Sequence, residues 1–68
     1  MVNVRALKAQ MVLQGIRVSD VIAELKMARH TWYKRINNPE NFTVGDVSKL
    51  AEILKMDVYE KERIFFGR

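Results

Sequence analysis

The segment that decides the fold is GIRVSDVIAELKMARHTWYKRI, residues 15–36. Its apolar residues recur three and four positions apart, which is the spacing of one face of an α-helix. Two such runs lie at about 18–25 and 28–37, separated only by a Lys-Met pair. The segment therefore predicts two short helices that meet at a tight turn. The side chains expected to face inward are Val21, Ile22, Leu25, Trp32 and Ile36.

Start and stop signals predict further helices on both sides of this segment. Asn3 is a good N-cap and Gly15 a natural stop, so a helix is expected over about 4–14. Downstream, two residue pairs match the capping-box pattern, namely Thr43 with Asp46 and Asp57 with Glu60. They predict helices over about 44–55 and 58–65. No long stretch has the alternating pattern of a strand, so the sequence predicts a compact all-α domain of five short helices.

Length and composition exclude several classes of protein. The 68 residues suffice for one small domain, residues 1–68, and 49% of them are hydrophobic. Without cysteine there is no disulfide or thiolate metal site, and a single histidine cannot hold a metal alone. No apolar run is long enough for a membrane span or a signal peptide, so a cytoplasmic protein without membrane contact is expected. The start at Met1 favours a complete chain over a fragment.

Positive charge is concentrated on one predicted helix. The formal net charge is +4, from twelve Lys and Arg against eight Asp and Glu. No acid occurs between Glu24 and Glu40, whereas four cations do, namely Lys26, Arg29, Lys34 and Arg35. The charge outside this stretch therefore sums to zero. A basic patch confined to one element is typical of a protein that binds a polyanion, although a solvated basic helix face explains the charge equally well.

Residues 15–36 resemble the helix-turn-helix of the phage-repressor/Cro-like family of lambda-repressor-like DNA-binding domains. FTVGDVSKLAEILKMDVYE, residues 42–60, is similar to that family's fourth helix and the start of its fifth. HTWYKRINNPENFTVGDVSKLAEIL, residues 30–54, looks closer still to a subset of small prophage regulators. The resemblance implies a five-helix domain whose third helix enters the DNA major groove. Glycine is usual at the family's turn, where this chain has Lys26, so the resemblance also implies a left-handed backbone at that lysine.

The resemblance assigns DNA contacts to the third helix and to the turn before it. It implies base contacts at the start and outer face of that helix, from Ala28, Arg29, His30 and Tyr33. It implies phosphate contacts around it, from Arg17, Ser19, Lys26, Lys34, Asn37 and Asn38. Arg29 is the leading base contact because a guanidinium can bond N7 and O6 of guanine together. Four residues have other interpretations: His30 as a solvated side chain, Tyr33 as a cover for the core, Arg35 as a salt-bridge partner and Asn38 as a turn residue.

These observations predict a regulator rather than an enzyme. The sequence has no Ser/His/acid set, glycine-rich phosphate loop or metal-ligand spacing, so no catalytic residue, cofactor or small-molecule effector is expected. The expected function is sequence-specific binding of double-stranded DNA, as a repressor of phage or prophage type that occupies an operator. Two alternatives stay open, a protein-interaction module of the same fold that binds a regulator or polymerase subunit, and a nonspecific nucleic-acid binder.

The apolar C-terminal segment adds a possible homodimer. Ile64, Phe65 and Phe66 are too apolar for a free terminus. We expect two of the three to pack on the core and the third to be available to a dimer interface. Dimers are usual in the family that this chain resembles, because two half-sites one helical turn apart raise affinity for a palindromic operator.

Overall fold

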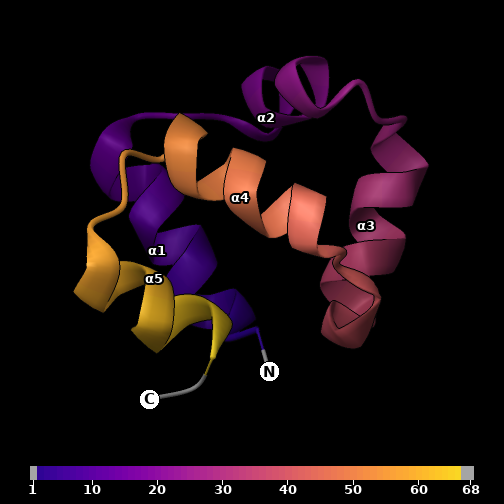
Figure 1. Cartoon of the computed structure of the whole chain (residues 1–68). Helices are drawn as coiled ribbons and strands as arrows, with labels where there is room; N and C mark the ends of the chain where they lie inside the picture. Colours follow the sequence, from indigo (N-terminus) through magenta and orange to yellow (C-terminus); the bar gives the residue numbers. More distant parts are fainter. Residues whose placement is uncertain (1, 67–68) are drawn as a thin grey trace.

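The fold consists of five α-helices in the computed structural model, which describes residues 2–66. The helices are α1 (Val4–Gln14), α2 (Val18–Leu25), α3 (Arg29–Asn37), α4 (Val44–Ile53) and α5 (Val58–Phe65), and a 3₁₀ turn, η1 (Pro39–Asn41), joins α3 to α4. No strand occurs among the described residues, so the predicted all-α class and five helices are confirmed. In Figure 1, α4 crosses the centre, α1 and α5 lie toward one end, α2 lies above, and α3 stands at the other end.

The helices begin where the capping residues predict. The Asn3 side chain accepts from the Ala6 N–H at 3.0 Å and starts α1. At α4, the Thr43 hydroxyl accepts from the Asp46 N–H at 3.0 Å, and the Asp46 carboxylate accepts from the Thr43 N–H at 3.2 Å. Asp57 and Glu60 form the same reciprocal pair at the start of α5, at 2.8 and 3.0 Å. Each pair satisfies backbone donors that have no partner within the helix.

Two helix boundaries differ from the sequence-based prediction. α3 begins at Arg29, because Ala28 is its extended N-cap residue, with φ −71° and ψ 150°. α4 ends at Ile53, two residues before the predicted end near Lys55. There Lys55 takes a left-handed φ of 51°, and the Met56 N–H bonds back to the Ala51 carbonyl at 2.9 Å. No glycine marks this reversal, so the residue pattern alone did not reveal it.

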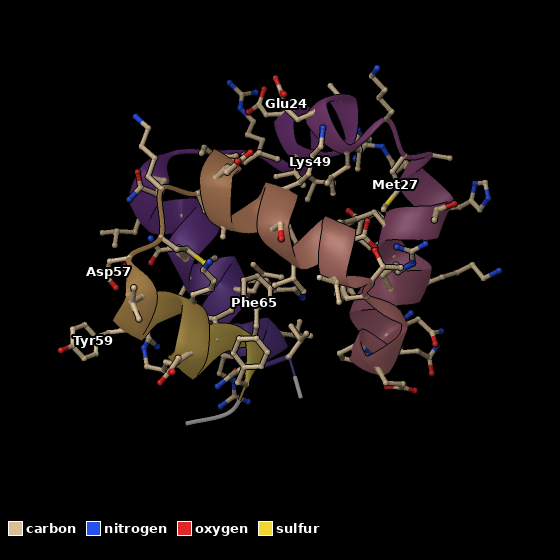
Figure 2. The ribbon with its side chains drawn as sticks, in the orientation of Figure 1. Glu24, Met27, Lys49, Asp57, Tyr59 and Phe65 are labelled. Carbon is tan, nitrogen blue, oxygen red and sulfur yellow. The ribbon has the colours of Figure 1, made fainter. Side chains whose placement is uncertain are left out.

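A single hydrophobic core lies between the helices. All five helices contribute to its buried residues, which are Leu7, Met11, Val21, Trp32, Ile36, Leu50, Leu54, Ile64 and Phe65. Trp32 meets Phe42 edge to face, with ring centroids 5.9 Å apart. Phe65 points inward beneath α4 (Figure 2), whereas Phe66 is 57% exposed. The prediction that two residues of the C-terminal apolar triplet pack on the core is therefore confirmed.

One buried polar side chain was not predicted. Gln10 is 3% exposed, and its amide donates to the Leu54 carbonyl at 3.4 Å. A buried amide needs such a partner, because an unpaired polar group in the core is destabilising. The contact joins α1 to the end of α4, where the carbonyl has no partner within its own helix.

The turn between α2 and α3 carries a left-handed residue, as the resemblance implies. Lys26 has φ 53° and ψ 47°, and Met27 donates its N–H to the Ile22 carbonyl at 3.0 Å to close the turn. A side chain disfavours this conformation by about 1–2 kcal/mol, whereas glycine adopts it freely. The turn is therefore strained at one residue, although its hydrogen bonds are complete.

Lys26→Gly is expected to raise the free energy of unfolding by roughly 0.5–1 kcal/mol, because it removes the left-handed strain at some loss of chain entropy. Urea denaturation followed by far-UV circular dichroism measures the change. Lys49→Gly is the matched control, because Lys49 is exposed within α4 and should lose about 1 kcal/mol. Equal destabilisation by both substitutions would contradict strain at Lys26.

Candidate nucleic-acid interface

α3 presents one continuous polar face to solvent. Trp32 and Ile36 are 2% and 8% exposed and fix the opposite side of the helix in the core. The exposed residues of the helix, which we call the outer face of α3, are Arg29, His30, Tyr33, Lys34 and Asn37. At about 100° per residue they spread over roughly 140° of the circumference. Five of the sequence-predicted contacts therefore share one face, because the two apolar anchors orient it.

One of the three cations of α3 is neutralised by an acid of another helix. Arg35 forms an ion pair with Asp46 of α4, and this is the one ion pair among residues 2–66. Arg35 is only partly exposed and lies off the outer face. The pairing agrees with the salt-bridge interpretation of Arg35. It leaves Arg29 and Lys34 as the cations that α3 presents to a ligand.

The start of α3 leaves backbone donors available. Ala28 is exposed and has no side chain that can cap the helix, so no side-chain hydrogen bond satisfies its first N–H groups. The first turn also contains no acid. Helix N-termini with free N–H groups favour an anion nearby. Ala28, Arg29 and His30 therefore meet at a helix end where both the backbone and a side chain are positive.

The start of α2 is a weaker anion site than the sequence indicates. Arg17 is its N-cap residue, and Ser19 lies within its first turn; both are exposed. However, the Asp20 carboxylate accepts from the Arg17 N–H at 3.0 Å and already occupies this helix end. A phosphate here would meet that negative charge. The Arg17 guanidinium can still reach a phosphate from its side chain, and the exposed Lys26 lies at the other end of the same helix.

The end of α3 adds polar groups beside the outer face. Asn38 is the C-cap residue of the helix, and its side-chain amide donates to the Lys34 carbonyl at 3.4 Å. Asn38 therefore has a structural role in ending α3. A groove between α3 and η1 is lined by Lys34 and Arg35 together with two residues not predicted, Thr31 and Asn41. Asn41 could be placed beside Lys34 only once η1 was known, because that turn folds the chain back along α3.

A small pocket lies where α1, the start of α2 and α3 meet. Its volume is about 320 Å³, and we call it the α1–α3 pocket. Its apolar lining consists of Met11, Val12, Ile16, Val18 and Trp32. Lys8, Arg17 and Tyr33 complete it. The pocket brings a predicted phosphate contact, Arg17, together with a predicted base contact, Tyr33. Lys8 was not predicted, because its proximity to Arg17 depends on how α1 packs against α2.

Metal-binding clusters and membrane-spanning helices are both absent from the described residues. No group of three or more His, Asp or Glu side chains within residues 2–66 is arranged to hold a metal ion. None of the helices in that range is long and apolar enough to cross a lipid bilayer. Comparison of the chain with protein-family models, with curated proteins and with solved structures found no match.

Proposed function

We propose that this chain is a helix-turn-helix protein of the lambda-repressor-like type that binds double-stranded DNA sequence-specifically, with α3 in the major groove. The observation that carries the proposal is the outer face of α3, which is polar, free of acid and held outward by Trp32 and Ile36. An α-helix with its side chains is about 10–12 Å in diameter, so a major groove about 12 Å wide admits one helix.

The residues divide by position into base readers and phosphate contacts. Arg29, His30 and Tyr33 lie on the first turns of α3, where a helix tip reaches base edges, and Ala28 is small enough to meet a thymine methyl. Lys34, Asn37 and Asn38 follow toward the C-terminal end, and Lys26 and Arg17 come from α2 and its turn. The last group would neutralise the DNA backbone and so set the position of α3. Bound at an operator, the domain would act as a repressor by occupying the site.

A homodimer forms part of the proposal, and α5 offers the surface for it. Two exposed side chains of α5 are largely apolar, Val58 at 70% and Tyr59 at 83%, and Phe66, the residue after the helix, is 57% exposed. Figure 2 shows Tyr59 pointing away from the other helices. Two copies joined through α5 would present two α3 helices, and a palindromic site would bind both.

Selection of bound sites from a random DNA pool is the test of this function. We expect one enriched sequence, bound about 10³-fold or more tightly than a scrambled duplex of the same composition. Both duplexes are then titrated between 50 and 200 mM salt. Three phosphate-contacting cations per protomer predict a slope of log affinity against log salt of about −3 for each protomer bound. Equal affinity for both duplexes across this range would identify a nonspecific binder, and no affinity for either would favour a protein partner.

A further inference from the structure

The α1–α3 pocket combines an apolar floor with a positive rim. Trp32 and Met11 are 2% and 6% exposed and form part of the floor, and Lys8 and Arg17 lie among the lining residues. None of the lining residues is acidic, and the Asp20 carboxylate at the start of α2 accepts from the Arg17 backbone N–H at 3.0 Å and forms no ion pair with its guanidinium. The volume of about 320 Å³ lies at the lower end of the range for small-molecule sites, about 300–1,000 Å³. The pocket is thus sized for a small ligand and biased toward a negative one.

The apolar and cationic lining residues together favour a ligand that has both an apolar part and a negatively charged part. A bare phosphate or chloride would gain nothing from Met11 and Trp32, and a neutral hydrocarbon would gain nothing from Lys8 and Arg17. We propose that the α1–α3 pocket binds a small aromatic carboxylate, with its ring on the apolar floor and its carboxylate accepting from the two cations. Apolar burial supplies the affinity, and charge-assisted hydrogen bonds from the cations orient the ligand.

Binding there has a consequence for DNA. Arg17 and Tyr33 line the pocket and also belong to the proposed DNA interface. A carboxylate held by Arg17 neutralises a cation that a phosphate needs, and a ring beside Tyr33 restricts that side chain. The ligand is therefore an antagonist of DNA binding. This consequence rests on the proposed function, whereas occupancy of the pocket does not.

The first measurement is a titration of ¹⁵N-labelled protein with naphthalene-2-carboxylate, followed by NMR at constant ionic strength. Trp32 is the only tryptophan of the chain, so one indole N–H signal reports on the pocket floor. We expect saturable shifts of that signal and of the Ile16 and Val18 amides. Naphthalene-2-carboxamide, which has the same ring without the charge, should bind about tenfold more weakly. Equal affinity for both compounds, or shifts that do not saturate, would overturn the proposal.

Two exposed positions allow variants that leave the core intact. Lys8→Met keeps the aliphatic stem but removes the charge, and should reduce carboxylate affinity to nearly that of the carboxamide. Val12 is 81% exposed, so Val12→Phe can fill the pocket without entering the core and should abolish binding of both compounds. Lys49→Met, which removes a cation from α4 outside the pocket, is the matched control and should bind like the unmodified protein. Unchanged affinity in Val12→Phe would refute the assigned location.

The second measurement tests whether the ligand weakens DNA binding. Naphthalene-2-carboxylate should weaken binding of the selected duplex by the unmodified protein but not by Val12→Phe, as read by fluorescence anisotropy. If no duplex is bound at all, the proposed function fails while the NMR titration still decides whether the pocket is a site. If the ligand binds and DNA affinity is unchanged, the antagonism is refuted. Shifts of the same signals with protein concentration alone would show that a second copy covers the pocket, which also overturns the proposal.

Discussion

Replacing Trp32 with alanine is expected to leave the chain largely unfolded at 25 °C. The indole is 2% exposed and packs edge to face on Phe42. Removing a buried aromatic side chain of this size destabilises a protein by about 3–5 kcal/mol. A domain of this length has a total stability of roughly 3–10 kcal/mol, so the loss is comparable with the whole. Far-UV circular dichroism during thermal unfolding measures it, and a cooperative transition close to that of the unmodified protein would contradict the assignment of Trp32 to the core.

The neighbouring aromatic residue is the matched control. Tyr33 is the next residue of the same helix and is 47% exposed, so Tyr33→Ala should lose no more than about 1 kcal/mol, as exposed substitutions usually do. Trp32→Phe should lie between the two, since it keeps a ring but leaves a gap. This order separates the core role of Trp32 from a general need for aromatic side chains in α3.

Arg29→Ala is expected to lower affinity for the selected duplex about 5- to 150-fold, the loss of one bidentate contact worth about 1–3 kcal/mol. Arg29 is exposed at the first position of α3 and pairs with no acid among the described residues. The substitution should also flatten base preference at one position of the site, which a repeated selection would reveal. Fluorescence anisotropy with the selected and scrambled duplexes measures the loss of affinity.

Two further substitutions serve as comparisons for Arg29→Ala, one at a proposed phosphate contact and one outside the proposed interface. Lys34→Ala should weaken binding of both duplexes alike and reduce the salt slope by about 1, as expected for a phosphate contact. Arg5→Ala removes the same charged group from an exposed position on α1, outside both α3 and α5, and should change neither specificity nor the slope. Arg29→Ala with full affinity and unchanged base preference would show that α3 is not the recognition helix as assigned.

Most of the fold could be predicted because its signals are local. Asn3, Thr43 and Asp57 each cap a helix through bonds that reach only three residues along the chain, and such bonds are visible in sequence. The end of α4 could not be predicted, because Leu54 and Lys55 continue a helical pattern and only the packed structure reverses the chain there. The burial of Gln10 likewise depends on a carbonyl 44 positions away.

Some features of the candidate site could likewise be predicted from local sequence, whereas others depend on how the helices pack. The outer face of α3 follows from the spacing of Trp32 and Ile36, which fixes the direction of every residue between them. The carboxylate of Asp20 at the start of α2 and the approach of Lys8 to Arg17 needed the structure. The acid that Arg35 pairs with also needed it, because that pair joins two helices that the sequence does not place relative to one another. The contacts with DNA themselves stay predictions.

The pairing of Arg35 with Asp46 has a consequence for how α3 is presented. The Asp46 carboxylate accepts from the Arg35 guanidinium and also from the Thr43 N–H that begins α4. A rotation of α3 about its own axis would therefore strain the bond from Arg35 to a carboxylate that the first turn of α4 already holds in place. The rotational setting of α3 is preorganised before any ligand arrives. Little conformational entropy then remains to be lost on binding, so more of the contact energy appears as affinity.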